Sequence, residues 1–182
     1  MKRILIMMFA LSVMAGNIQA QERELTKEEK KAMQEKLDSL MFDEAVKAIN
    51  AKDFTLEADQ VVFKYGQTAY VTSNTNFVSV NGEHAVVQVA FNIPVAGPNG
   101  LGGITVEGKM SSYEVNTDRK GNVYLTMNVM GTGISARLDI SMAKGTNRAT
   151  VNISPNFNSN RLTLNGVVLP SQRSNVFKGS SL

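Results

Sequence analysis

Cysteine is absent from the 182-residue sequence, and histidine occurs once, at His84. The lack of cysteine excludes disulfide bonds, thiolate metal sites, a cysteine nucleophile and a lipid-modified N-terminal cysteine. A single imidazole acts as a general base or a metal ligand only when other groups assist it. His84 follows Asn81-Gly82-Glu83, a hairpin signal. We therefore expect an exposed turn residue and no histidine-based site.

The sequence also lacks a surplus of positive charge. It has 19 basic and 16 acidic residues, and without Lys2 and Arg3 of the predicted leader the net charge is +1. Nucleic-acid-binding domains carry a basic field that this balance does not supply, so we expect no nucleic-acid partner. The content of 43% hydrophobic and 19% charged residues is that of a globular protein and excludes wholesale disorder.

Long apolar runs are found only at the N-terminus. Lys2-Arg3 precede the run Ile4–Ala15, which is followed by small and polar residues up to Ala20. This order is that of a secretory signal, and the run is shorter than the roughly 20 residues of a membrane-spanning helix. We predict a signal peptide over residues 1–20, cleaved near Ala20, and a single β-rich domain over residues 21–182. The mature protein would be periplasmic or secreted, without a transmembrane segment. A retained N-terminal anchor is the alternative.

One amphipathic helix is predicted over residues 27–50. Thr26 followed by Glu29 forms a capping box, in which each side chain satisfies a backbone amide at the start of the helix. Apolar residues then recur about every four positions and form one stripe, which we expect to bury against the sheet. The stripe consists of Met33, Leu37, Leu40, Met41, Ala45, Ala48 and Ile49.

Apolar and polar residues alternate through most of residues 53–91 and 103–169, with turn residues between the segments. This pattern is typical of antiparallel strands with one buried face. Asn81-Gly82 predicts a two-residue hairpin turn, and Met110-Ser111-Ser112 predicts another turn. The fold class is α+β and mostly β: a curved antiparallel sheet or partly closed barrel of eight to nine strands, with the helix packed on it. The tail after Pro170 either docks or frays.

A glycine-rich connection separates the two strand-forming regions. A phosphate-binding loop would continue into a helix, whereas this one continues into Ile104-Thr-Val-Glu, a predicted strand. The connection is therefore either a plain link or a loop that faces a ligand. The candidate ligand-facing residues are Gly97, Asn99, Gly100, Gly102 and Gly103.

Catalytic chemistry is not predicted. Acid–base catalysis needs carboxylates that converge, whereas the acids of the predicted sheet alternate outward into solvent. Glu107 and Glu114 could approach each other across the predicted turn, but only on the solvated side. We expect no catalytic, metal-binding or cofactor-binding residues and no cofactor. The outward acids are Asp53, Glu57, Asp59, Glu83, Glu107, Glu114, Asp118 and Asp139.

Several segments resemble one protein family. They are Gly97–Lys109, Tyr113–Gly121, Asn158–Gly166 and Val176–Leu182. In these turn and strand residues the chain resembles the uncharacterised exported family called domain of unknown function 4251, which is found mainly in gut Bacteroidetes. The resemblance implies a periplasmic or surface-associated β-rich domain. It implies no substrate, cofactor or catalytic residue.

Two functional hypotheses follow from the sequence. The first is a non-enzymatic exported binding module with an apolar groove between helix and sheet, where a small apolar ligand would sit. The second is a cell-envelope interaction protein that meets an envelope protein or a glycan with an exposed sheet face or edge. A large open groove would favour the first hypothesis, and a packed interior would favour the second.

Overall fold

The structure, a computed structural model, describes residues 26–90, 103–132, 135–156 and 161–179. The chain divides into two units, Met1–Met33 and Gln34–Leu182, and all strands belong to the second. Among the described residues, no helix is both long and apolar enough to cross a membrane. The elements are α2 (Lys27–Ala51), β1 (Asp53–Phe63), β2 (Thr68–Tyr70), β3 (Phe77–Asn81), β4 (His84–Ala90), β5 (Gly103–Thr117), β6 (Val123–Gly131), β7 (Ser135–Met142), β8 (Arg148–Pro155), β9 (Leu162–Pro170) and the 3-10 helix η1 (Ser171–Arg173).

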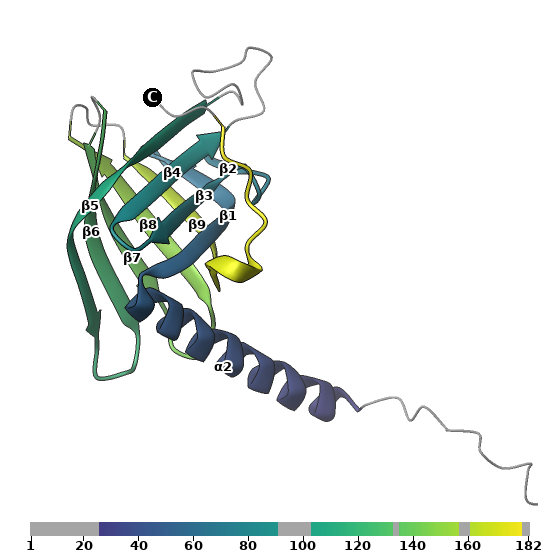
Figure 1. Ribbon diagram of the computed structural model, residues 1–182. Helices are drawn as coiled ribbons and strands as arrows, with labels where there is room; N and C mark the ends of the chain where they lie inside the picture. Colours follow the sequence, from purple (N-terminus) through teal and green to yellow (C-terminus); the bar gives the residue numbers. More distant parts are fainter. Residues whose placement is uncertain (1–25, 91–102, 133–134, 157–160, 180–182) are drawn as a thin grey trace, which may run out of the picture. The chain divides into compact units, whose positions relative to one another are not determined.

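Eight antiparallel strands close into a barrel (Figure 1). They are neighbours in the order β1-β3-β4-β5-β6-β7-β8-β9, and β9 pairs with β1 to complete the ring. The first half of β1 pairs with β3, and its second half pairs with the short strand β2. The predicted α+β, mostly β fold with eight to nine antiparallel strands is confirmed. The sequence left an open sheet or a partly closed barrel as alternatives, and the structure shows full closure.

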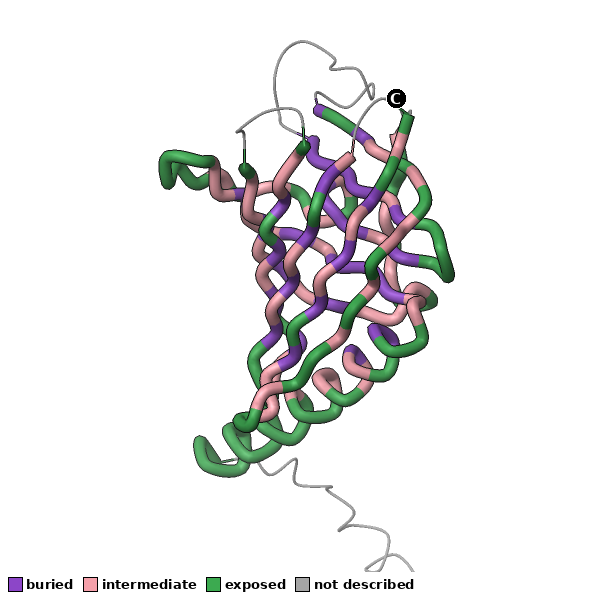
Figure 2. Tube along the Cα trace, turned by 90° about the vertical axis from the view of Figure 1, so that its left-hand side faces the viewer, coloured by how far each residue is buried: buried purple, intermediate pink, exposed green. Residues whose placement is uncertain are grey.

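Apolar side chains from alternate strand positions fill the interior of the barrel. Figure 2 shows buried and exposed positions alternating along the strands. An eight-stranded barrel is just wide enough inside for side chains to fill it, or for one small ligand to enter. Large interior side chains that are less than 2% exposed include Phe54, Leu56, Leu125, Met127, Leu138, Met142 and Leu164. The apolar stripe of each predicted strand is therefore the packed interior of the barrel.

The last turns of α2, which belong to the second unit, pack against the barrel. Ala45, Ala48 and Ile49 are buried in the same apolar core as the strand residues. The hydroxyl of Tyr113 on β5 donates a hydrogen bond to the carbonyl oxygen of Ile49 (2.5 Å), and burial raises the pKa of Tyr113 above its ordinary value. This end of the helix is thereby fixed at the point where the chain enters β1.

The predicted contact along the whole helical stripe is wrong for its earlier residues. The side chains of Leu37 and Leu40 are 49% and 55% exposed, and Met33 belongs to the other unit. A closed barrel offers no open concave face on which a long helix could lie, so an adjoining helix buries only the residues that reach the barrel end. The capping box is confirmed: Glu29 N donates to Thr26 Oγ1 (3.2 Å), and Thr26 N donates to Glu29 Oε2 (2.8 Å).

This packing predicts that a small truncation at Ile49 destabilises the protein more than a larger truncation at Leu37. Ile49→Val removes one methylene from a residue that is 1% exposed and should lower the free energy of unfolding by about 0.5–1.5 kcal/mol. Leu37→Ala removes more carbon but should change it by less than about 0.5 kcal/mol, because the side chain is half exposed. Urea denaturation of both variants measures the difference. A greater loss for Leu37→Ala than for Ile49→Val would contradict this packing.

Two predicted turns differ in the structure. Asn81 pairs with His84, so the β3–β4 turn is formed by Gly82 and Glu83. Of these two, only Gly82 has positive φ (58°), as in the turn type that needs glycine at its first central position. The expected break at Met110-Ser111-Ser112 is instead a bulge within the continuous strand β5, with Ser112 at φ 52°. A bulge changes the strand's direction without ending it, which the local sequence does not distinguish from a turn.

The C-terminal segment, residues 171–179, crosses the outside of the barrel (Figure 1). Ser174 Oγ donates to Glu57 Oε1 on β1 (2.7 Å), and Lys178 Nζ pairs with Glu107 on β5 (2.7 Å). Gln88, which faces outward from β4, is 0% exposed and hydrogen bonds to this segment. The tail therefore docks as a covering segment, and the outer face of β6–β9 is left outside its path.

Candidate binding face

The glycine-rich connection falls mostly outside the described residues. Gly97, Asn99, Gly100 and Gly102 lie in that part of the chain, so the ligand-facing loop stays a prediction for them. Gly103 is described and is the first residue of β5, buried and paired with Ala90. A Cβ atom at Gly103 would lie 1.8 Å from the carbonyl oxygen of Val89. This glycine therefore permits close strand packing.

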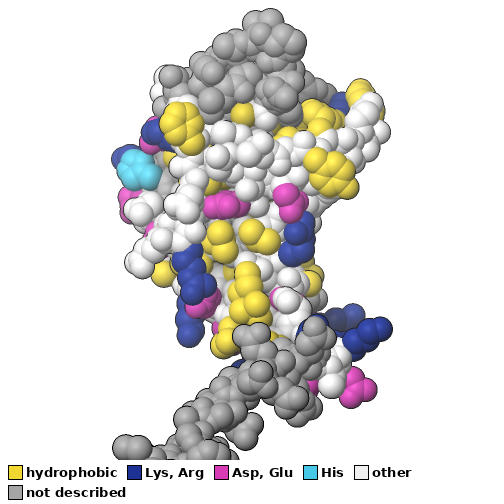
Figure 3. Space-filling model, turned by 90° about the vertical axis from the view of Figure 1, so that its right-hand side faces the viewer, with side chains coloured by type: hydrophobic (Ala, Val, Ile, Leu, Met, Phe, Trp, Pro, Cys, Tyr) yellow, Lys and Arg dark blue, Asp and Glu magenta, His cyan; other side chains and the backbone are white. Residues whose placement is uncertain are grey.

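The predicted outward acids do not converge. Asp59 pairs with Arg148 and Asp139 pairs with Arg137, while Glu107 pairs with Lys178 of the tail. His84 is exposed at the start of β4, as expected, and Figure 3 shows the histidine, in cyan, on the surface. Within the described ranges, no group of three His, Asp or Glu side chains is placed to hold a metal ion.

A row of polar side chains crosses the outer face of five strands. The strand register places Gln60 of β1 beside Asn165 of β9, then Thr150 of β8, Ser141 of β7 and Tyr124 of β6. We call these five residues the polar row. Residues opposite each other in antiparallel strands share one face of the sheet. At strand spacings of 4.7–4.9 Å, the row is about 19 Å long.

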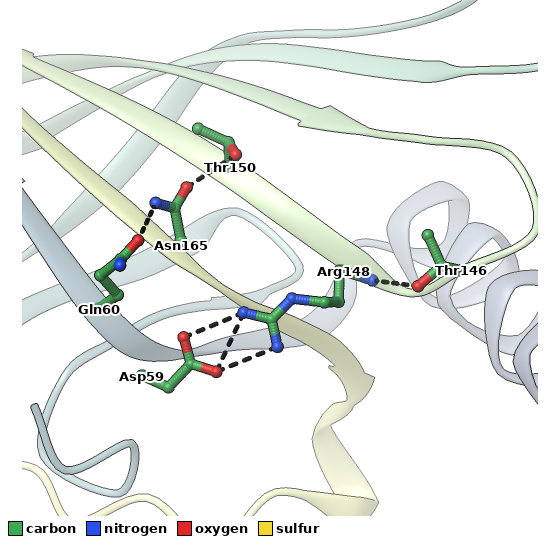
Figure 4. A network of polar contacts seen from close by, with 6 residues as sticks. All are labelled: Asp59, Gln60, Thr146, Arg148, Thr150 and Asn165. Atoms are coloured by element: carbon green, nitrogen blue, oxygen red, sulfur yellow. Dashed lines mark hydrogen bonds and ion pairs between the residues drawn. The ribbon is translucent and has the colours of Figure 1, made fainter. Parts of the chain in front are cut away.

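Hydrogen bonds orient one half of the polar row (Figure 4). Thr150 Oγ1 donates to Asn165 Oδ1 (2.8 Å), and Asn165 Nδ2 donates to Gln60 Oε1 (2.6 Å). These contacts fix the direction in which each amide presents its donor and its acceptor. The side-chain nitrogen of Gln60 and the hydroxyl of Ser141 make no hydrogen bond to another described residue. Oriented amides with donors still available are suited to a ligand with several hydroxyl groups.

The polar row lines a depression of about 490 Å³ together with Asn122 and Arg148. We call it the neutral depression. Arg148 donates three hydrogen bonds, each 3.1 Å long, to the carboxylate of Asp59, so the ion pair cancels both charges (Figure 4). This bidentate arrangement fixes the guanidinium plane.

The rim of the neutral depression is fixed by the turn between β5 and β6. Asp118 accepts hydrogen bonds from the backbone N–H groups of Asn122 (2.9 Å) and Lys120 (2.8 Å). The bond from the Asn122 backbone is the main reason why the pKa of Asp118 is lowered. The Tyr124 hydroxyl makes a longer contact with the same carboxylate (3.4 Å). These bonds hold Asn122 and Tyr124 at the end of the polar row.

A second depression, of about 580 Å³, lies on the same outer face. We call it the basic depression. The charged side chains that line it are Lys64, Arg137, Arg161 and Asp139. Arg137 Nη2 lies 3.0 Å from Asp139 Oδ1, and the hydrogen bond between them lowers the pKa of Asp139 and raises that of Arg137. The Thr126 hydroxyl also donates to Asp139 (2.8 Å).

Sequence reasoning did not find the polar row. Each of its residues, taken alone, is an ordinary outward residue of an amphipathic strand. The row exists because four strand pairings bring these positions to the same height, and residues 60 and 165 are far apart in the sequence. The available signal was the repeated outward Thr, Asn, Gln and Ser at strand centres, which becomes a site only once the register is known.

Comparisons with known proteins identify the family. The family model for the "Domain of unknown function (DUF4251)" matches residues 36–168. The crystal structure of a DUF4251 family protein from Bacteroides eggerthii shares 51% sequence identity, covers 81% of this chain and 99% of that one, and has a TM-score of 0.69. No curated protein matches the chain. The chain therefore belongs to the DUF4251 family, as its turn and strand residues predicted.

Proposed function

We propose that this protein is a non-enzymatic module of the cell envelope that binds a carbohydrate chain on the outer face of its barrel. The observation that carries the proposal is the hydrogen-bonded polar row in the neutral depression. Of the two hypotheses from the sequence, this is the one that uses an exposed sheet face. Strands of a rigid barrel suit the purpose because they hold side chains at a fixed spacing.

Tyrosine rings at the two ends of the polar row supply flat apolar surfaces. Tyr124 ends the row on β6 and is 44% exposed. At the other end Tyr70 of β2 pairs with Gln60 and is 85% exposed. A sugar ring has C–H groups on its faces and hydroxyls at its rim, so tyrosine rings can pack on the faces while amides bind the rim. The length of the row corresponds to a chain of several sugar units.

Binding without cleavage fits the residues that line the neutral depression. Glycoside hydrolysis ordinarily uses two carboxyl groups that flank the scissile bond. Among the described residues lining this depression there is no Asp or Glu, and the neighbouring carboxylate of Asp59 is occupied by Arg148. The side chains present are hydrogen-bonding groups of hydroxyl and amide type, which orient a ligand but do not transfer protons to a glycosidic oxygen.

An apolar ligand in the interior is less well supported. Phe54, Leu56, Leu125 and Met127 occupy the barrel with at most 1% exposure. The last turns of α2 are buried in the same core. They pack directly on the strands at the place where the sequence suggested an open groove between helix and sheet. A small apolar ligand would have to displace packed side chains, which is costly in a close-packed core.

The proposed location is the periplasm or the outside of the cell. It rests on the sequence of residues 1–20, in which Lys2-Arg3 and the apolar run Ile4–Ala15 have the pattern of a signal peptide cleaved near Ala20. A glycan-binding module in this location would meet carbohydrate chains of the envelope or of the surroundings. Mass measurement of the exported protein, with Gln21 as its first residue, checks the cleavage.

The proposal predicts saturable binding of oligosaccharides to the intact protein, measured by titration calorimetry with a panel of hexasaccharides. Tyr124→Ala and Asn165→Ala should each weaken the binding by about tenfold or more, equivalent to about 1.4 kcal/mol. Asn81→Ala is the matched control, because Asn81 is an exposed asparagine of β3, outside the polar row, and should bind as the wild type does.

Two results would contradict this function. One is that no hexasaccharide of the panel binds. The other is that binding survives both substitutions in the polar row. A fluorescent fatty acid tests the interior instead: saturable binding that is unchanged by Asn165→Ala would favour the apolar-ligand hypothesis.

A further inference from the structure

We infer that the carbohydrate bound by this protein carries acidic groups, and that the basic depression binds one of them while the polar row holds the sugar chain. This inference rests on the proposed function, because the two depressions form one extended surface. It adds the chemical class of the ligand: an anionic oligosaccharide, whose negative group is a carboxylate or a sulfate.

The two depressions are adjacent on the outer face of the sheet. The polar row includes Gln60, Asn165 and Thr150. The basic depression begins two residues further along each of the same three strands. Its lining there consists of Val62 on β1, Thr163 on β9 and Asn152 on β8. Residues two apart on a strand lie on the same face, about 6.6–6.8 Å from each other. A branch or a neighbouring unit of a sugar chain in the polar row therefore reaches the basic depression.

The polar side chains at the boundary continue the chemistry of the row. Thr163 Oγ1 donates to Asn152 Oδ1 (2.8 Å), and both residues line the basic depression. The hydrogen bond between Thr150 and Asn165, two residues away on the same two strands, likewise joins a threonine hydroxyl to an asparagine side-chain oxygen. Amides and hydroxyls thus extend without interruption from one depression into the other.

The basic depression has an excess of positive charge that the neutral depression lacks. Three basic side chains and one acidic side chain line it, a net charge of +2. The acidic one, Asp139, already accepts hydrogen bonds from Arg137 and Thr126. Its charge is compensated within the protein, so it offers little repulsion to an incoming anion. In the neutral depression the single charged lining residue, Arg148, is compensated by Asp59.

Arg161 is the side chain best placed to bind the anion. It is exposed directly before β9 and lines the basic depression, and it makes no ion pair with another described residue. A guanidinium group matches the two oxygen atoms of a carboxylate or sulfate in a bidentate arrangement. Lys64 adds a second positive charge: it directly follows Phe63, the last residue of β1, and Phe63 pairs with Leu162, the residue next to Arg161.

The test compares three hexasaccharides by calorimetry on the intact protein: a neutral glucan, an oligogalacturonate with carboxylates, and a sulfated glycosaminoglycan fragment. At low salt we expect at least one acidic probe to bind about tenfold more tightly than the neutral one. The advantage should shrink when the salt concentration is raised to about 0.5 M, because screening weakens exposed charge pairs. Which of the two acidic probes binds better identifies the anionic group.

Arg161→Gln should remove the preference for acidic probes and leave the affinity for the neutral probe unchanged. Lys109→Gln is the control, because it removes the same charge from an exposed position of β5, four strands from β9 in the barrel. Equal affinity for neutral and acidic probes would overturn the inference while leaving the proposed function intact. Binding of an acidic probe that is unchanged by Arg161→Gln would also overturn it. Failure of all three probes to bind would refute the proposed function itself.

Discussion

Replacing Gly166 with alanine is expected to prevent normal closure of the barrel. Gly166 of β9 pairs with Ala58 of β1, beside the bulge between Ala58 and Gln60. A Cβ atom at Gly166 would lie 2.0 Å from the carbonyl oxygen of Glu57 and 2.7 Å from Ala58 Cα. Both contacts are with backbone, which has no side-chain torsion to relieve them. The two strands that close the ring would have to separate.

We expect Gly166→Ala to lower the free energy of unfolding by at least about 3 kcal/mol, the upper end of the usual cost of overpacking. The matched control is Gly66→Ala. Gly66 has φ 85° but no atom within 4 Å of the added Cβ, so its replacement costs only backbone strain, roughly 1–2 kcal/mol. Chemical denaturation of both variants gives the comparison. Equal stability of the two variants would mean that β1 and β9 do not approach each other this closely.

Replacing Gln88 with alanine is expected to release the C-terminal segment. Gln88 Oε1 accepts hydrogen bonds from Thr105 Oγ1 and from the backbone N–H of Gly179, both 2.8 Å long. Its side-chain nitrogen donates to the carbonyl oxygens of Phe177 (2.8 Å) and Thr75 (3.0 Å). One buried amide thus joins β4, β5, the connection before β3 and the tail.

Gln88→Ala leaves several buried polar groups without their partner, and each such group costs about 1–3 kcal/mol. Since water can reach some of them once the tail detaches, we expect a total loss of about 3 kcal/mol. Gln67→Ala, at an exposed position of the β1–β2 turn, is the control and should have little effect. Hydrogen exchange should show faster exchange of the Phe177 and Gly179 amides in Gln88→Ala. Retained protection of both amides would show that other contacts hold the tail.

The sequence predicted the elements well because their signals are local. The helix was expected at residues 27–50 and occurs at Lys27–Ala51, with the predicted Thr26–Glu29 capping box. Strand alternation identified the interior residues such as Leu125, Met127 and Leu138. Two turns were misplaced, at Asn81-Gly82 and at Met110-Ser111-Ser112, because a shift of one residue or a bulge depends on pairing with the neighbouring strand.

Contacts between distant parts of the chain were beyond local reasoning. Gln88 looks like an outward polar residue of β4, yet the tail buries it completely. Leu37 looks like part of a buried helical face, yet it is half exposed, because the barrel end receives only the last turns of α2. In both cases the exposure of the residue depends on a part of the chain that is distant in the sequence, and the residues around it do not show where that part lies.

By itself the sequence determined a mostly β fold with one N-terminal helix, the apolar residues of its core and the family to which the chain belongs. The fold and the core residues follow from composition, from the period of two along strands and from capping and turn residues, all of which act over a few positions. The family followed from the resemblance of particular turn and strand segments to its members. The tertiary structure alone decided the closure of β1 on β9, the position of the tail and the polar row from Gln60 to Tyr124. Each of these depends on strand register and on pairing between residues as far apart as 60 and 165. The alternation within one strand determines which face of the sheet a residue occupies, but it does not determine which residue of the neighbouring strand lies beside it.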